Sequence, residues 1–146
     1  MANPLYGQNK ADNALANQVG EFQRVGADLT LTAADAGKCL LFTPPASAGA
    51  LDITLPAHKE GLRFLIIQES AYDTAVCNVA SADGNDFIGS ITAATGNGDT
   101  AAASDDKVVF GSATVAGDFI EVMSTGIKWC IVNSGSAVTT NGVLFG

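Results

Sequence analysis

The chain has 146 residues, with 15 acidic and 7 basic side chains and a formal net charge of −8. A domain of this size buries roughly two-thirds of the surface that its unfolded chain exposes, so a core can form without disulfides or metals. The negative field repels phosphate backbones and anionic lipids, which argues against nucleic acid and membrane as partners. No apolar run approaches the roughly 20 residues of a membrane span, and the start lacks the basic-then-apolar order of a secretion signal. We therefore expect a chain that is made and kept in solution.

The N-terminal segment 1–26 differs in composition from the rest of the chain. Asn, Gln and Ala dominate it, and Leu15, Val19 and Phe22 recur at spacings of four and three, as on one face of a helix. We expect an N-terminal arm over this segment with a short amphipathic helix. Because so short a helix is marginal alone in water, the arm needs a surface, either its own domain or a neighbouring subunit.

Short strands are predicted throughout residues 27–146. In "ALDITLP", Leu51, Ile53 and Leu55 alternate with polar residues, which is typical of a half-buried strand. The segment "LRFLII" (62–67) is apolar on nearly both faces, as in a central strand covered on each side by a second sheet or another subunit. Roughly ten such strands between turn signals predict an all-β, antiparallel β-sandwich or jelly-roll-like domain. The absence of a fixed-period repeat argues against a solenoid.

Two turns have specific signals. "TAADAG" places Thr32 three residues before Asp35 and ends in Gly37, which predicts one capped helical turn stopped by glycine. In "GDFIEVMSTGIKWCIVNSG", Thr125-Gly126 predicts a two-residue hairpin turn. We expect Ile127, Trp129 and Ile131 to share the buried face of this hairpin. The predicted structural core includes Phe64, Ile66, Phe119, Trp129 and Ile131.

The cysteines are predicted to be free core thiols. Cys39, Cys77 and Cys130 are odd in number, widely spaced and set among apolar residues, as in "KCLLF" and "KWCIV". Cysteine is among the most buried residue types, and this spacing does not suit a disulfide framework. The pattern indicates folding in a reducing cytoplasm.

Catalytic chemistry has few candidates in this sequence. The only histidine, His58, lies in a "PAHKEG" turn with no nucleophile marked beside it. Pairs of acids for glycoside cleavage could be drawn from Glu60, Glu69, Asp73 or Glu121, as from any acidic β protein. We expect no catalytic residues, no cofactor and no enzymatic activity.

A calcium site is the one metal site that the sequence leaves open. The loops at 81–86 and 94–106 offer Asp83, Asn85, Asp86 and Asp99 as oxygen ligands, but the terminal glutamate of a dedicated calcium loop is missing. We expect structural turns here and assign no metal ligand.

The pattern of β elements resembles small β-sandwich virion proteins of tailed bacteriophages. The segments "LTLTAADAGKCLLF", "ITLPAHKEGLRFLII" and "GDFIEVMSTGIKWCIV" carry the resemblance, which covers residues 27–135 and leaves out the arm. A chain of this length is more similar to a head decoration (cement) protein than to a fibre. The resemblance implies a non-enzymatic homotrimer on the outer capsid surface, made in the host cytoplasm, that binds the major capsid protein and stabilises the assembled shell. Capsid or subunit contacts would then fall to apolar residues of the arm: Leu5, Tyr6, Leu15, Val19 and Phe22.

One alternative is a tail or fibre-associated module that recognises a host receptor. Such a module should expose aromatic residues on its loops, for which Tyr72 and Phe87 are the candidates.

Overall fold

The structure is a computed structural model, which describes residues 22–45, 49–71, 75–84, 87–94, 98–101, 105–137 and 142–146. The described part is all-β apart from η1, a single 3-10 turn at Ala33–Asp35. Its strands form two large sheets and a small two-stranded one. The first sheet has the order β1 (Phe22–Val25), β3 (Cys39–Phe42), β5 (Arg63–Gln68), β11 (Phe119–Ser124), β12 (Trp129–Gly135), β7 (Phe87–Ile88). The second has the order β13 (Val143–Phe145), β10 (Lys107–Phe110), β6 (Val76–Ser81), β4 (Ala50–Leu55), β2 (Leu29–Thr30), and β8 (Ser90–Ile91) pairs with β9 (Asp99–Thr100).

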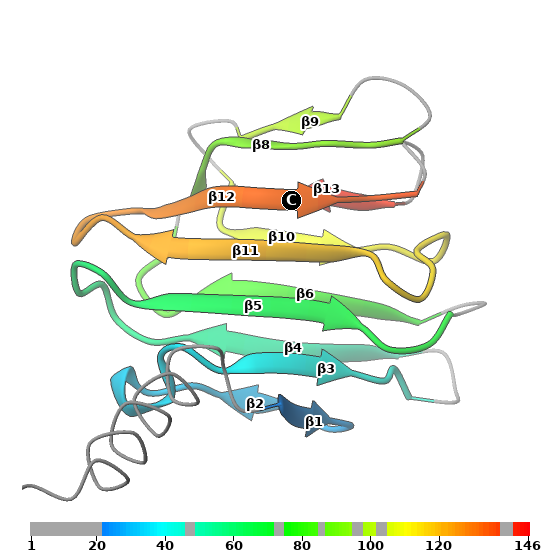
Figure 1. The fold of residues 1–146 in the computed structure, drawn as a ribbon, viewed down its shortest axis with the longest axis horizontal. Coiled ribbons are helices and arrows are strands. Elements are labelled where there is room, and N and C mark those ends of the chain that lie inside the picture. Colours follow the sequence, from blue (N-terminus) through cyan, green and yellow to red (C-terminus); the bar gives the residue numbers. More distant parts are fainter. Residues whose placement is uncertain are drawn as a thin grey trace, which may run out of the picture.

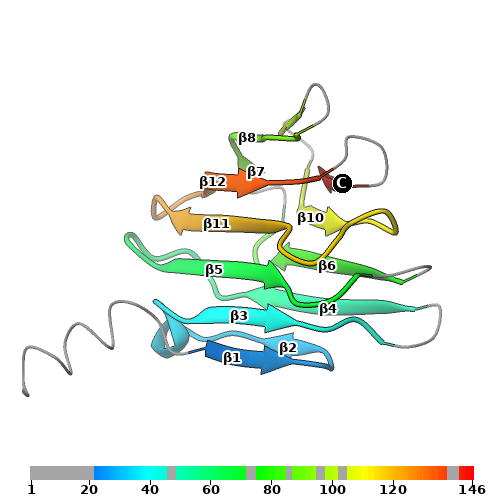
Figure 2. The ribbon, with the colours of Figure 1, turned by 45° about the vertical axis from the view of Figure 1, so that its right-hand side comes forward.

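The two large sheets lie one in front of the other (Figure 1). Figure 2 shows the same arrangement from a second direction, with β4 and β6 behind β3 and β5. The core cluster of the described residues lies between the sheets and takes side chains from both. Phe42 of the six-stranded sheet and Phe110 of the five-stranded sheet meet edge to face, with ring centroids 4.8 Å apart. Both phenylalanines are fully buried, so this pair joins the sheets directly.

Each of the two large sheets contains both parallel and antiparallel strand pairs, so the prediction of an antiparallel architecture is wrong. From β1 to β6 the chain alternates between the sheets, so β1, β3 and β5 run parallel in one and β2, β4 and β6 run parallel in the other. A strand that crosses to the second sheet and returns arrives in its original direction, which makes its neighbour parallel. The later strands do pair antiparallel: β5 with β11, β11 with β12, β6 with β10, and β10 with β13.

The sequence spacing between paired parallel strands is uneven in the first part of the chain. Phe22 pairs with Cys39, and Cys39 pairs in turn with Leu65, which is a longer spacing. In the other sheet Leu29 pairs with Ile53, and Ile53 pairs with Val79 at the same spacing as Cys39 and Leu65. The spacing therefore becomes regular only in the later strands, which is too short a run to be recognised as a repeat.

The expected alternation in β4 is confirmed, since Leu51, Ile53 and Leu55 are buried while Asp52 is exposed. The expected capped turn is confirmed as well. The backbone N–H and hydroxyl of Thr32 donate to Asp35 Oδ2 at 2.8 and 2.7 Å, and Lys38 Nζ donates to Asp35 Oδ1 at 2.6 Å. The ammonium of Lys38 and the Thr32 donors lower the pKa of Asp35 from 3.8 to about 2.

Replacing Asp35 with asparagine is expected to lower the free energy of unfolding by up to about 1 kcal/mol, the usual loss for a capping residue with an exposed ion pair. Because the folded-state pKa of Asp35 is depressed, its contribution is present above pH 4 and is lost as the pH falls towards 2. Urea unfolding of both proteins at pH 6 and pH 2.5 measures this. An unchanged difference between the two proteins at the two pH values would contradict the assignment.

The hairpin turn is longer than predicted. Ser124 pairs with Trp129, so residues 125–128 form the loop, closed by a hydrogen bond from Thr125 N to Lys128 O at 2.9 Å. Gly126 takes a φ of 95°, which glycine adopts without strain. Ile127 is 76 % exposed in this loop and does not share the buried face of the hairpin, so that prediction is wrong.

Four of the five predicted core residues are buried: Phe64, Ile66, Trp129 and Ile131. Phe119 is the exception, because its side chain points away from the core on the opposite face of β11. Its ring lies over Gly135 of β12, where an added Cβ would come within 2.8 Å of Phe119 Cε1. Phe119 is therefore half-buried without belonging to the core.

The expected arm helix lies outside the described residues, as do Leu5, Tyr6, Leu15 and Val19. Phe22 is described, and it begins strand β1 instead of continuing a helix. Residues Phe22–Val25, which the sequence pattern assigned to the arm, pair with β3 and so form the edge of the six-stranded sheet. The spacing of Phe22 from Leu15 and Val19 predicted a helix, but pairing of β1 with β3 places Phe22 in a strand.

Candidate interaction surface

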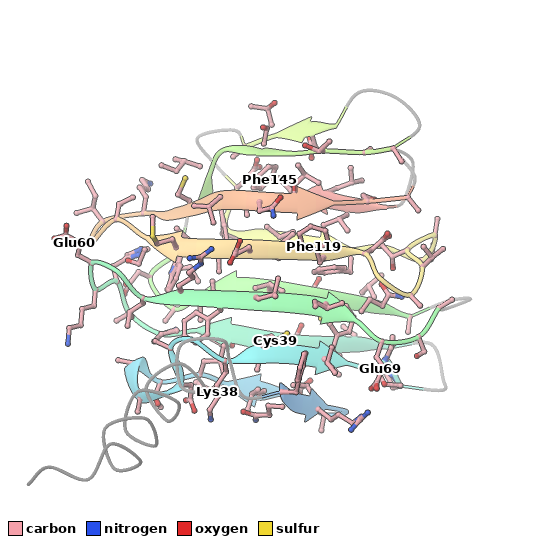
Figure 3. The ribbon with its side chains drawn as sticks, viewed as in Figure 1. Lys38, Cys39, Glu60, Glu69, Phe119 and Phe145 are labelled. Carbon is pink, nitrogen blue, oxygen red and sulfur yellow. The ribbon has the colours of Figure 1, made fainter. Side chains whose placement is uncertain are left out.

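The face of the six-stranded sheet that points away from the core is mainly apolar, and we call it the outer face. Side chains of residues that are paired across neighbouring strands point to the same side of a sheet, so each set of paired residues forms a row across the outer face. One row runs through Phe22, Cys39 and Leu65, and the next through Leu41, Ile67 and Phe119. A third row contains Met123, Cys130 and Ile88. Figure 3 shows the side chains on the sheet and labels Cys39 and Phe119.

Several of these apolar side chains are open to solvent. Phe22 is 67 % exposed, Ile88 41 % and Met123 38 %, while Leu41, Leu65 and Ile67 are half-buried. No described helix or strand lies over this face in the view of Figure 1. An apolar sheet face that keeps exposed large side chains is a candidate for contact with another macromolecule.

The corresponding face of the five-stranded sheet is more polar. Its outward positions include Thr30, Asp52, Thr54, Asn78 and Lys107, and Asn78 donates from Nδ2 to Asp52 Oδ1 at 2.7 Å. This alternation of apolar inward and polar outward residues is ordinary for a sheet with one wet face. The outer face of the six-stranded sheet departs from it.

Two arginine–glutamate pairs lie on the outer face. Arg24 Nε donates to Glu69 Oε1 at 3.0 Å, and Arg63 Nε donates to Glu121 Oε1 at 2.7 Å. The hydrogen bond from Arg24 lowers the pKa of Glu69, so this carboxylate stays ionised with its partner. These are the chain's only arginines. Because the four charges cancel, the acidic excess of the protein lies elsewhere than on this face.

All three thiols are free, as predicted. Cys77 lies in the core and Cys39 is nearly buried on the outer face, and burial raises the pKa of both thiols. Cys130 is half-buried on the outer face, so the prediction of a core thiol is wrong for this residue. Because a thiolate is the reactive form of cysteine, the raised pKa values leave Cys39 and Cys77 as structural residues.

His58 is more buried than its turn position suggests. Its side chain is 10 % exposed, and its ring lies 5.9 Å from that of Trp129. The backbone N–H of His58 donates to Asp83 Oδ2 at 3.1 Å, and Nε2 is 3.9 Å from the same oxygen. This arrangement ties the turn at residues 56–61 to the loop after β6 and places the imidazole against the core.

Several candidate acids are engaged in structural contacts, whereas Glu60 is exposed at the end of the turn before β5. Glu69 and Glu121 are held by arginines, and Asp99 accepts hydrogen bonds from the backbone N–H groups of Phe145 and Thr100. Asp73, Asn85 and Asp86 lie outside the described residues. Among those described, no group of three or more His, Cys, Asp or Glu side chains could hold a metal ion.

The aromatic residues suggested for receptor recognition give little support to that role. Phe87 is 2 % exposed and packs in the core, and Tyr72 lies outside the described part of the chain.

A helix that could span a membrane is absent from the described segments.

None of the models of known protein families matches the chain, and a search of curated proteins finds no similar sequence. Function must therefore be argued from the surface itself.

The sequence patterns did not predict most of this surface. Met123, Cys130, Ile88 and Leu41 were not singled out as surface residues, and neither were the two arginine pairs. One signal did point to it, since a strand that is apolar on both faces needs cover on both, and β5 is that strand.

Proposed function

We propose that this protein is a non-enzymatic decoration (cement) protein of a tailed-bacteriophage head. In this proposal it acts as a homotrimer on the outer capsid surface, after synthesis in the host cytoplasm, and binds the assembled shell of major capsid protein. The observation that carries the proposal is the apolar, charge-balanced outer face on an otherwise acidic all-β body. Such a face is suited to contact with another subunit of the homotrimer, and the negative charge of the rest of the body suits the outside of a shell better than its DNA-facing side.

The fold supports this role as a rigid platform. We take the two facing sheets as a β-sandwich with mixed strand directions, in place of the antiparallel β-sandwich or jelly-roll-like domain that the sequence predicted. The Phe42–Phe110 contact and the buried Trp129 tie the two sheets into one core. A rigid body presents its binding surfaces without the entropic cost of ordering them on contact.

The proposed mechanism is mass action. A protein that binds only the assembled shell stabilises that state by RT ln(1 + [L]/Kd) for each site, without any covalent step. Apolar residues of the segment before β1, Leu5, Tyr6, Leu15 and Val19, would add contacts to the shell. Phe22, which begins β1 at the edge of the sheet and is 67 % exposed, would contact a neighbouring subunit.

Deleting residues 1–21 is expected to leave a folded protein that binds heads at least about tenfold more weakly, the loss of roughly one good anchoring contact. The deletion stops before Phe22 because β1 belongs to the six-stranded sheet. Co-sedimentation with expanded heads of the encoding virus, prepared without this protein, measures the binding. A variant with Leu5, Tyr6, Leu15 and Val19 changed to serine is the matched control for length.

Saturable binding of the full chain in multiples of three copies is the expected result. Equal binding by the full and shortened chains would remove the arm from the proposal. No binding by either chain would overturn the decoration role and favour the receptor-recognition module.

A further inference from the structure

We propose that the outer face of the six-stranded sheet is the surface through which one copy of this chain contacts another. The inference rests on the homotrimer proposed above and names the part of the protein that forms it. It places capsid contacts on other surfaces, so that self-association and shell binding become separable properties.

Charge favours a second copy as the occupant of this face. Two copies that each carry a net charge of −8 repel one another over most of their surfaces. On the outer face the charges of Arg24 and Arg63 are balanced within one copy by Glu69 and Glu121. An identical partner can approach there without like-charge repulsion and without leaving a charge unpaired. A strongly charged partner would find no excess of opposite charge on this face to bind to.

The extent of the face meets the minimum for a stable contact between proteins. The six strands contain 29 residues in all, and at about 3.3 Å per residue and about 4.8 Å per strand they give a face of roughly 460 Å². In a homotrimer three such faces meet around the three-fold axis and bury on the order of 1,400 Å² in total, which lies within the range of specific interfaces. The other outer face has polar side chains among its outward positions, including the Asp52–Asn78 pair, beside apolar ones such as Val76, Val109 and Leu144.

The composition of the face also suits an interface core. Phe22, Met123 and Phe119 are of the aromatic and methionine types that are enriched in such cores. The paired arginines lie among them, and arginine is likewise enriched. Leu65 and Ile67 are half-buried in the single chain, so each keeps apolar surface that a neighbouring copy could cover.

The test changes one residue on each outer face. Ile67→Glu places a charge on the outer face of the six-stranded sheet, and Val109→Glu places the same charge at a half-buried outward position of β10 in the other sheet. Met123→Glu is a second variant at a more exposed position, which protects the test if Ile67→Glu does not fold. Sedimentation equilibrium measures mass, and the melting temperature reports folding.

The wild-type protein is expected at about three times its 14.8 kDa chain mass. Ile67→Glu and Met123→Glu should raise the dissociation constant about 100-fold or more, because an interface must then bury an unpaired charge. Val109→Glu should remain associated.

A wild-type protein that stays monomeric at roughly 100 µM, well above the dissociation constants of standard-sized interfaces, would overturn the inference. Association that Val109→Glu abolishes and Met123→Glu leaves intact would overturn it as well. Failure of head binding by a protein that still associates through the outer face would overturn the decoration role alone.

Discussion

Replacing Trp129 with alanine is expected to lower the free energy of unfolding by about 3–5 kcal/mol, the usual loss for a large buried aromatic side chain. Trp129 is fully buried in β12, and its ring centroid lies 5.8 Å from that of Phe64 and 5.9 Å from that of His58. Alanine would leave a cavity between the hairpin and β5 that the sheets can only partly close. Urea-induced unfolding, followed by circular dichroism, measures the change.

Two controls separate packing from other effects. Trp129→Phe should cost less than Trp129→Ala, because the buried indole N–H has no acceptor among the described residues and phenylalanine refills part of the volume. Ile127→Ala, at a site 76 % exposed in the adjoining loop, should change stability by less than about 0.5 kcal/mol. A Trp129→Ala protein as stable as the Ile127→Ala protein would place the tryptophan outside the core.

The second large effect is expected where the two sheets meet. Phe42→Ala and Phe110→Ala should each destabilise the protein by about 3–5 kcal/mol, because both side chains are fully buried. Since the rings meet edge to face across the sheets, the double variant should show a coupling energy of about 0.5–1.5 kcal/mol. A double-mutant cycle measured by urea unfolding gives this value directly.

The matched control for this cycle pairs Phe110 with Phe22, which lies exposed on the outer face. Those two changes should add within about 0.3–0.5 kcal/mol, as expected for residues that share no partner. Additive effects of Phe42 and Phe110 would mean that the sheets do not face one another as described.

Local patterns in the sequence predicted local structure well. Alternation in residues 51–55 identified the buried side of β4, and the Thr32–Asp35 spacing identified the capped turn. These features depend on side-chain period and on hydrogen bonds between residues three apart, which a single sequence displays. The prediction of an all-β fold followed from the same signals.

Long-range pairing could not be read in this way. Whether β3 pairs parallel with β1 or antiparallel with another strand depends on crossovers between the sheets, which no local pattern displays. Phe22 followed the spacing of a helix, yet it pairs with Cys39 in a strand. Phe119 was assigned to the core because it is large and apolar, but the strand period placed it on the other side of β11.

The candidate surface was visible only in part. The doubly apolar segment 62–67 indicated a strand that needs cover on both faces, and the structure gives β5 that position. The other rows of the outer face come from strands distant in sequence, and only their register brings Met123 beside Cys130 and Cys130 beside Ile88. The arginine–glutamate pairs join residues 45 and 58 positions apart, which no local pattern reveals.

The central claim is that the protein binds an assembled head and stabilises it. Differential scanning calorimetry of expanded heads that lack this protein, with and without added protein, tests the claim most directly. At a free concentration 100 times Kd the account predicts about 2.7 kcal/mol of stabilisation for each occupied site, seen as a rise in the melting temperature of the shell that saturates with occupancy. A shell whose melting temperature stays the same at full excess of the protein would contradict the account.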